Sequence, residues 1–478
     1  MTTPPPQALQ LPTDPEGPTG KLCLWLAGLQ LADVPEPVIE RAKDLLLDGI
    51  ACALVGAQLP WSRVATQAVF GFEGAGDGIV IGWGRTIGRP AAALLNGTFI
   101  QGFELDDVHY RGPLHSASLV IPAILAVAAG QPVSGADALV AAIAGFETGP
   151  RVGMALHGLQ MLSRGWHSGA VFGTHAAAAT AGRLLGLAPD AMEDAIGLAG
   201  TQSAGLMAAQ FEAMSKRMHH GFSARAGYSA AMLASAGYTG IKRVYERDYG
   251  GFLAMFGEGH NPDATKITEG LGMQWETSHI SIKRYAAMGA LHGPLDAVFE
   301  LRARRPFRPE EIQSVSIGMS HASFHHGWWE AERPLTPIGA QMHVGYAVAA
   351  AILDGAAMAR QFSPARIDSA DIWALMPRIR AYHEPAFDTD FAARLNSVMT
   401  VRFADGSEEV VRIATPKTVG EPLQRSGVID KYNALTDGII SHDRRDSIRQ
   451  MVLALETLPS LTPLIDALAA PVGCTFDL

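Results

Sequence analysis

The chain has 478 residues, of which 48% are apolar and only 18% are charged, and its formal net charge is −10. This length predicts two or three domains with a large buried core. The acidic balance argues against a nucleic-acid-binding protein, which needs a basic surface to neutralise phosphates. Three widely spaced cysteines, Cys23, Cys52 and Cys474, indicate neither a disulfide framework nor a zinc ribbon, and they fit a cytoplasmic protein best.

Residues 1–20 are rich in proline and lack both the basic and the apolar segment of a signal peptide. We predict a disordered tail here, with the fold beginning near Lys21. The longest apolar runs, SLVIPAILAVAAG and ALVAAIAGF, are shorter than the roughly 18–20 residues that span a bilayer. We therefore expect a soluble protein without a membrane partner.

Residues 21–275 predict a helical domain. The segment PVIERAKDLLLDGIACALVGA places Pro37 in a first helical turn, and its apolar residues recur at helical spacing from Val38 to Ile50. Later segments, such as THAAAATAGRLLGL and ARAGYSAAMLASAGY, are dominated by Ala, Gly and Leu. Because small side chains let helix axes approach closely, we expect tight helix packing with short connections.

Residues 276–414 predict a smaller α+β domain. EIQSVSIGMS alternates as a strand does, and SVMTVRFADGSEEVVRIAT predicts two strands joined by a turn at Asp405-Gly406. AQMHVGYAVAAAILDG, between them, is helical in pattern. Residues 415–478 return to helix and should pack on the first domain. The predicted fold class is therefore mainly α, with a large all-helical domain built from the N-terminal part and the C-terminal tail, and a smaller α+β domain.

The segment QGFELDDVHYRGPLHSAS concentrates charge in a chain that otherwise has little. Its ionisable residues are Glu104, Asp106, Asp107, His109, Arg111 and His115, and they directly precede an apolar run. Helix capping would account for one or two of these groups. Burying the others without a purpose would be unfavourable, whereas a cleft could use them as general acids and bases. We therefore favour a catalytic site over a set of helix caps.

Two stretches without acidic residues carry clustered cations. The first, between Glu212 and Glu246, contains Lys216, Arg217, His219, His220, Arg225, Lys242 and Arg243, and the second, between Glu276 and Asp296, contains His279, Lys283, Arg284 and His292. In an acidic protein these clusters suggest the walls of a pocket for a ligand with several carboxylates. From composition alone, ordinary solvated helix faces explain them equally well.

Two further histidine motifs could carry chemistry. His167, in GWHSGAVFG, begins an Ala-rich helix, where backbone N–H groups could meet a ligand carboxylate, and a capped turn is the alternative. His321 and His325 have the spacing of metal ligands, but with no obvious carboxylate partner nearby we expect no metal site. Without a G-x-S-x-G elbow, a P-loop or a G-x-G-x-x-G motif, the sequence favours neither a serine hydrolase nor a nucleotide cofactor.

The chain resembles the MmgE/PrpD family, which includes 2-methylcitrate dehydratases and cis-aconitate decarboxylases, in a series of motifs. These are, in order, FELDDVHYRGPLHSAS, GWHSGAVFGTHAAAATAGRLLGL, SAGLMAAQFEAMSKRMHHGFSARAGYSAAMLA, YGGFLAMF and IKRYAAMGALHGPLDA. The resemblance runs from about Lys21 almost to the C-terminus, and it is strongest to the fungal cis-aconitate decarboxylases. It implies a helical domain with a smaller α+β lid, usually as a homodimer.

The resemblance also implies roles for individual residues. Catalytic roles are implied for Asp106, His115, His167, Lys216 and Tyr346, and substrate contacts for Glu104, Asp107 and Lys283. To the substrate contacts we add His109, Arg217, His219 and His220 from the same charged segments, together with Met288. The chain departs from the family at Ala287 and Met288, where the fungal decarboxylases resemble K-x-Y-A-C-C-G, and at His343, where small hydroxyl residues are common.

The implied activity is a cofactor-free decarboxylation of cis-aconitate, or a close tricarboxylate, to itaconate. Lys216 and Lys283 would hold the retained carboxylates and stabilise the carbanion left by CO₂. His115 or His167 would deliver the proton, with Tyr346 as a possible relay. No metal or organic cofactor is expected. Two alternatives stay open: a dehydratase acting on 2-methylcitrate or a related hydroxy-tricarboxylate, and a non-catalytic carboxylate-binding protein with the same fold.

Overall fold

A computed structural model describes residues 13–211, 213–259 and 261–477 of the chain. Most of the predicted tail, residues 1–12, lies outside the described residues. The first helix, α1, begins at Pro18, three residues before the expected start at Lys21, and its residues Thr19 and Gly20 are already buried.

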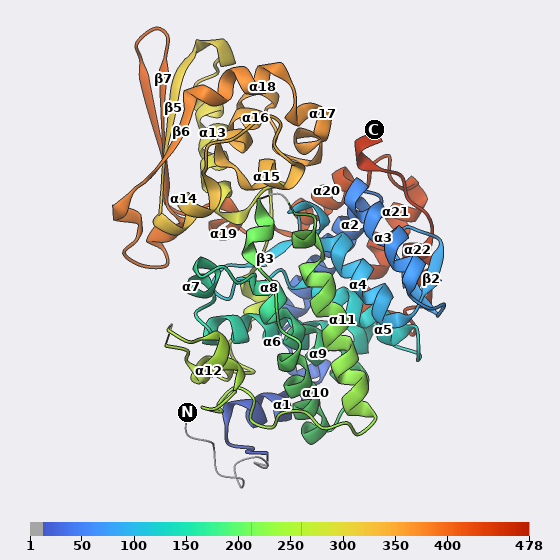
Figure 1. Cartoon of the computed structure of the whole chain (residues 1–478). Coiled ribbons are helices and arrows are strands. Elements are labelled where there is room, and N and C mark those ends of the chain that lie inside the picture. Colours follow the sequence, from blue (N-terminus) through green and yellow to red (C-terminus); the bar gives the residue numbers. More distant parts are fainter. Residues whose placement is uncertain (1–12, 212, 260, 478) are drawn as a thin grey trace.

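The first half of the chain is a body of closely packed helices (Figure 1). They are α1 (Pro18–Gly28), α2 (Glu36–Gly56), α3 (Pro60–Phe72), α4 (Arg89–Ile100), α5 (Ala117–Ala128), α6 (Gly135–Ala155), α7 (Gly158–Ser163), α8 (Ser168–Val171), α9 (Gly173–Leu184), α10 (Pro189–Thr201), α11 (Ser215–Ser235) and α12 (Phe252–Phe256). Helix α2 has Pro37 in its first turn and is buried from Ala42 to Gly56, which confirms the helix predicted there.

Small residues set the distance between α11 and its neighbours. A Cβ atom at Gly221 would lie 2.2 Å from the backbone oxygen of Leu94 on α4, and one at Gly227 would lie 2.4 Å from that of Thr174 on α9. Real side chains do not tolerate such approaches, so only glycine fits at these two positions. The predicted tight helix packing is confirmed, and it fixes the helix that carries Lys216.

Two short antiparallel pairs interrupt the helical half, and neither was predicted. Strand β1 (Gly78–Val80) pairs with β2 (Arg85–Ile87). Strand β3 (Asp107–His109) pairs with β4 (Ile280–Ile282), so that Asp107 lies opposite Ile282 and His109 opposite Ile280. The second pair joins the charged segment to the start of the downstream α+β part.

The α+β part is built on one four-stranded sheet with the order β6-β5-β7-β8. Its strands are β5 (Ile312–Met319), β6 (Ile379–His383), β7 (Ser397–Phe403) and β8 (Glu408–Ile413), and its main helices are α13 (His292–Arg304), α14 (His321–Gly327), α15 (Pro337–Met342), α16 (Val344–Asp354), α17 (Pro364–Ile367) and α18 (Ala370–Leu375). The hairpin at Asp405-Gly406 is confirmed, with Gly406 at a φ of +84°. Helices α13 and α16 pack on the sheet, as Figure 1 shows.

The C-terminal segment returns to the helical half. After α19 (Lys417–Gly420), helices α20 (Arg425–Thr436) and α21 (His442–Leu453) pack against α2, and α22 (Thr462–Ala469) packs against α21 (Figure 1). The mainly α fold class, with a helical domain completed by the C-terminal tail and a smaller α+β part, is thereby confirmed. The domain boundaries at residues 275 and 414 stay predictions.

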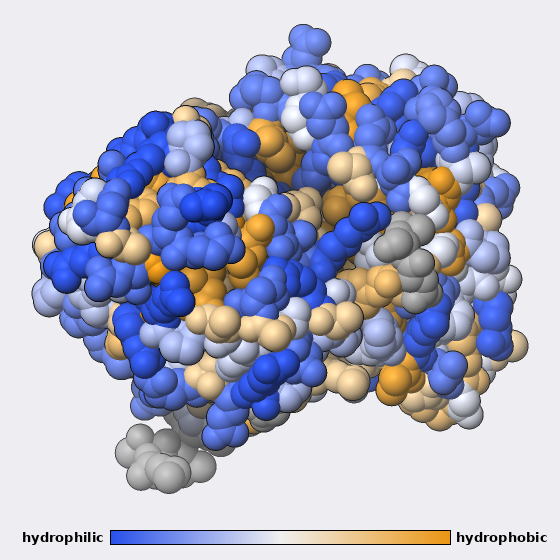
Figure 2. Space-filling view, turned by 90° about the horizontal axis from the view of Figure 1, so that it is seen from above, coloured by the Kyte–Doolittle hydropathy of each residue, from blue (hydrophilic) through white to orange (hydrophobic). Residues whose placement is uncertain are grey.

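Seen from above, the surface is mainly hydrophilic, with hydrophobic residues in smaller patches (Figure 2). Within the described ranges, no single helix is long and apolar enough to cross a membrane. One sharply bent pair, α2 with α3, meets the length and composition of a span, but α2 is the helix enclosed by the fold.

Candidate active site

A cavity of about 220 Å³ is lined by residues of both parts of the molecule. Glu104, His115, His167 and Lys216 line it from the helical half. Lys283, Met288 and several residues of the α+β part complete it. The charged segment and the two cationic stretches singled out in the sequence therefore meet at one cavity.

Glu104 is the centre of the charged cluster in this cavity. It follows the short 3₁₀ turn Gln101–Phe103 in a left-handed conformation, with a φ of 54°. One carboxylate oxygen, Oε1, accepts a hydrogen bond from Lys216 Nζ, and the other, Oε2, lies 2.9 Å from Lys283 Nζ. A non-glycine residue in this conformation is strained, and here the strain accompanies a carboxylate held between two ammonium groups.

The cluster has more positive than negative charge. Arg217 adds a third cation, with Nη1 3.8 Å from Glu104 Oε1, and all four side chains are buried. Burial would raise the pKa of Glu104, but Lys216, Lys283, His115 and Arg217 together hold it well below its usual range. Since three cations share one ionised carboxylate, the site attracts further anionic groups.

His115 is oriented by the backbone of the charged segment. Its Nδ1 lies 2.7 Å from the carbonyl oxygen of Asp107, which can only accept, so Nδ1 carries the proton. The buried carboxylate of Asp106 lies 3.4 Å from the same nitrogen, and its oxygens have no hydrogen-bond partner among the described residues. The other ring nitrogen, Nε2, is thus available to exchange a proton, next to a carboxylate that stabilises the charged ring.

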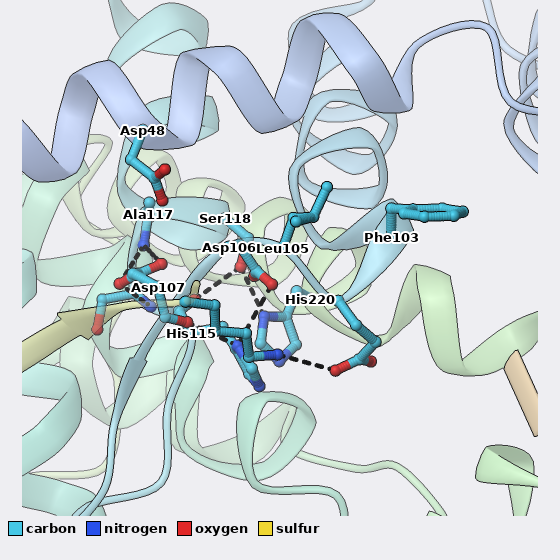
Figure 3. A network of polar contacts seen from close by, with 12 residues as sticks. Asp48, Phe103, Leu105, Asp106, Asp107, His115, Ala117, Ser118 and His220 are labelled. Carbon is cyan, nitrogen blue, oxygen red and sulfur yellow. Dashed lines mark hydrogen bonds and ion pairs between the residues drawn. The ribbon is translucent and has the colours of Figure 1, made fainter. Parts of the chain in front are cut away.

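A second histidine supports the first through a serine (Figure 3). Ser118 Oγ donates to the backbone oxygen of His115 at 2.7 Å, so the 2.6 Å contact between Ser118 Oγ and His220 Nδ1 must be donated by the histidine. The rings of His167 and His220 lie 5.3 Å apart. Burial, Lys216 and the neighbouring histidines hold the pKa of His167 well below its usual value, so His167 is neutral at pH 7.

Asp107 and His109 have structural partners. Asp107 accepts hydrogen bonds from the backbone N–H groups of Ser116 and Ala117, at 2.9 and 3.1 Å, and so caps the start of α5 (Figure 3). Burial and the nearby Asp106 raise its pKa well above its usual value. His109 Nε2 lies 3.0 Å from Glu276 Oε2. Both residues therefore stabilise the conformation of the charged segment and do not line the cavity.

A lysine from the C-terminal tail reaches the same segment. Lys431 on α20 donates from Nζ to the backbone oxygen of Leu105 at 2.6 Å, and it lies 2.7 Å from Asp48 Oδ1 on α2. Leu105 stands between Glu104 and Asp106, so this buried pair holds the backbone of the segment that carries the candidate site.

Comparison with known proteins assigns the chain to a family. Residues 20–265 match the MmgE/PrpD N-terminal domain, and residues 285–457 match the MmgE/PrpD C-terminal domain. The chain belongs to the MmgE/PrpD family.

Curated relatives cover almost the whole chain. Cis-aconitate decarboxylase-like protein oryM of Aspergillus oryzae is 44% identical over 94% of this chain and 97% of its own length. Cis-aconitate decarboxylase of Aspergillus terreus is 42% identical over 95% and 96%. Cis-aconitate decarboxylase of Homo sapiens is 25% identical over 93% of both chains.

The structure brings only some of the predicted MmgE/PrpD site residues to the cavity. Glu104, His115, His167, Lys216, Lys283 and Met288 line it. The remaining candidates are buried and do not line it; they are Asp106, Asp107, His109, Arg217, His219, His220 and Tyr346. Ala287, next to Met288, is also buried and does not line the cavity.

The contacts of Tyr346 differ most clearly from the prediction, which gave this residue the role of a proton relay. Its hydroxyl donates to the backbone oxygen of Gln361 at 2.6 Å, and burial raises its pKa. The departure from the family at His343 has a structural role, because its Nδ1 accepts from the N–H of Tyr346 and caps α16.

Within the first cationic stretch, Lys242 pairs with Asp190 and Asp194 on α10. That end of the stretch therefore belongs to a helix surface and not to the pocket.

Several polar lining residues of this MmgE/PrpD protein were missed. Ser320, Ser323, His326, Arg394 and Asn396 line the cavity from the α+β part. The segment GMSHASFHHG suggested only the metal-ligand spacing of His321 and His325. Arg394 follows Asp388 and Asp390, so it does not belong to a cationic stretch. Among the side chains that the structure describes, no group of three or more His, Cys, Asp or Glu is arranged to hold a metal ion.

Proposed function

We propose that the chain is a carboxy-lyase that converts cis-aconitate into itaconate and CO₂. The observation that carries this proposal is the 42% identity to the cis-aconitate decarboxylase of Aspergillus terreus over 95% of this chain. The cavity agrees with it, because a buried cluster with excess positive charge suits a substrate with three carboxylates.

The reaction breaks the bond between the CH₂ group and its carboxylate. Its electron pair passes into the allylic system, giving a dienolate on the carboxylate of the former alkene carbon. Lys216 and Lys283 would bind the retained carboxylates and offset this developing charge. The departing carboxylate should have no strong ion pair, because such a pair would stabilise the ground state.

The former alkene carbon must then accept one proton, which completes itaconate. We assign this proton to Nε2 of protonated His115, which lines the cavity and has Asp106 3.4 Å from its other nitrogen. His167 is the weaker candidate, since its lowered pKa leaves no proton to donate as an imidazolium. His115 returns to its protonated form from solvent.

The two alternatives have less support. A 2-methylcitrate dehydratase would use similar groups, but the Aspergillus terreus, human and mouse relatives are all named cis-aconitate decarboxylase. A non-catalytic binding protein would not need an oriented histidine next to a buried, unbonded carboxylate such as Asp106.

Proton NMR of the purified protein with cis-aconitate, and separately with 2-methylcitrate, tests the proposal. We expect the terminal methylene signals of itaconate to grow in the first tube and the second to stay unchanged. Appearance of 2-methylaconitate with an unchanged cis-aconitate spectrum would make the protein a dehydratase. Binding of both compounds without turnover would favour the non-catalytic alternative.

We also propose a cytoplasmic homodimer. Its location is supported by three buried cysteines, Cys23, Cys52 and Cys474, that form no disulfide. Self-association is supported by exposed apolar side chains on and just before α11, which are Leu206, Phe211, Met214, Phe222 and Leu233. Light scattering coupled to size exclusion should give twice the chain mass of 50.6 kDa, and a mass of one chain would refute the dimer.

A further inference from the structure

Arg394 has a feature that no other partly buried arginine shares in the part of the chain that the structure describes. Each of the others has a hydrogen bond or an ion pair with a protein group, for example Arg366 with Asp354 or Arg183 with the backbone oxygen of Leu29. The guanidinium of Arg394 has neither, although the residue lines the active-site cavity. A partly buried cation in a cavity wall that has no protein partner is free to bind an anionic ligand.

The main chain around Arg394 is held in place. Its N–H donates to the backbone oxygen of Asp390 at 3.1 Å, and its own carbonyl accepts from Ser320 Oγ at 3.1 Å. The carboxylate of Asp390, four residues earlier, is engaged elsewhere, because its Oδ1 accepts from the N–H of Ala393 at 2.9 Å. The backbone is therefore fixed, while the guanidinium keeps all its donors.

The charges of the cavity show what these donors would bind. Lys216, Lys283 and Arg217 share the single carboxylate of Glu104, which leaves an excess of two positive charges. Arg394, on the part of the cavity wall that the α+β part supplies, raises the excess to three. Cis-aconitate has three carboxylates, and a planar guanidinium can bind a carboxylate through two parallel hydrogen bonds.

We infer that Arg394 binds one of the two carboxylates that the substrate retains as it becomes itaconate; this inference rests on the proposed decarboxylase function. An ion pair with the departing carboxylate would stabilise the ground state and oppose the reaction. An ion pair with a retained carboxylate persists from substrate to product. Arg394 is thus a specificity-determining residue supplied by the α+β part.

The test compares Arg394→Gln, Arg394→Lys and the control Arg380→Gln with the wild-type enzyme. Arg380 lies on β6 of the same α+β part, is exposed and pairs with Glu330, so its loss should leave catalysis unchanged. The measurements are KM and kcat for cis-aconitate, and Kd for itaconate by calorimetry. Itaconate retains both carboxylates under discussion but lacks the third, so its Kd separates the two possible pairings.

For Arg394→Gln we expect KM for cis-aconitate and Kd for itaconate to rise together by about 10- to 100-fold. Arg394→Lys should recover part of both losses, and Arg380→Gln should stay within about twofold of wild type. A raised KM with an unchanged itaconate Kd would place Arg394 on the departing carboxylate and overturn the inference, as would no change in either. A wild-type enzyme that makes no itaconate would instead refute the proposed function.

Discussion

Lys283 donates a hydrogen bond of 2.9 Å to Glu104, although 179 residues separate the two in the chain. Lys216, on α11, binds the other oxygen of the same carboxylate. One buried side chain therefore joins the charged segment after α4, the helix α11 and the residues that follow β4. Both the stability of this region and the placement of its cations depend on Glu104.

Glu104→Gln should destabilise the protein and remove most of its activity. It leaves Lys216, Lys283 and Arg217 buried without a counter-charge, which should lower the free energy of unfolding by about 3–5 kcal/mol. We expect kcat to fall at least about 100-fold because the ammonium groups lose their positions. Urea unfolding and steady-state kinetics measure these effects. The control Glu330→Gln breaks an exposed pair and should change stability by less than about 1 kcal/mol.

Lys216→Ala should reduce kcat/KM by at least about 1,000-fold in a protein that still folds, because an anchor for the substrate carboxylates is lost. Lys242→Ala is the matched control, since Lys242 belongs to the same cationic stretch but pairs with Asp190 and Asp194 on α10. Its activity should stay within about twofold of wild type. Equal activity of the two variants, with both folded by circular dichroism, would remove Lys216 from the site.

His115→Gln should lower kcat by about 10²- to 10⁴-fold while changing KM for cis-aconitate little, because proton delivery is lost and the carboxylate anchors remain. His167→Gln should lower kcat less, since the neutral His167 does not supply the proton. Single-turnover kinetics with both variants measure the difference. A larger loss in His167→Gln would exchange the two roles.

Tyr346→Phe separates the structure from the family-based expectation of a proton relay. The hydroxyl of Tyr346 is bonded to the backbone of Gln361 away from the cavity, so kcat should change by less than about threefold. Stability should fall by about 1 kcal/mol through the lost hydrogen bond. A 100-fold loss of kcat would instead support a proton relay through Tyr346.

The stability of the protein should depend on pH through its buried histidines. Burial lowers the pKa of His175 to about 3, against about 6.5 in an unfolded chain. Between these values only the unfolded chain binds the proton, so His175 favours unfolding increasingly as pH falls below 6.5. The substitution His175→Gln should lower the free energy of unfolding relative to wild type. This loss, measured by urea unfolding, should shrink by about 2 kcal/mol from pH 7.5 to pH 5. The exposed His442→Gln should show no such change.

Local patterns predicted the elements whose partners are close in sequence. The hairpin of β7 and β8 follows from its Asp-Gly turn, and α2 follows from its apolar period. Strand β6 was missed because it pairs in parallel with β5, more than sixty residues earlier, and IRAYH has no clear alternation. Strand β3 was missed because a segment rich in acids and histidines reads as a loop until Ile280–Ile282 pairs with it.

The candidate site could also be predicted only in part. Charge clustering predicted Glu104, His115, Lys216 and Lys283 as site residues, and the structure brings all four to one cavity. It could not distinguish Lys216 from Lys242, because both lie in one cationic stretch and only the tertiary fold sends them to different partners. Charge clustering also could not find Arg394. This residue stands out only in the folded structure, where it lines the cavity and its guanidinium has no protein partner.

The contact between Lys431 and the backbone of Leu105 spans 326 residues. During synthesis at about 5–20 residues per second, roughly 15 to 65 seconds separate the appearance of these two residues. Through that interval the charged segment lacks the cation that holds it, whatever helices have already formed around it. The charged segment is therefore among the last parts of the protein to complete its contacts, and we expect a nascent chain stalled before α20 to be helical but inactive.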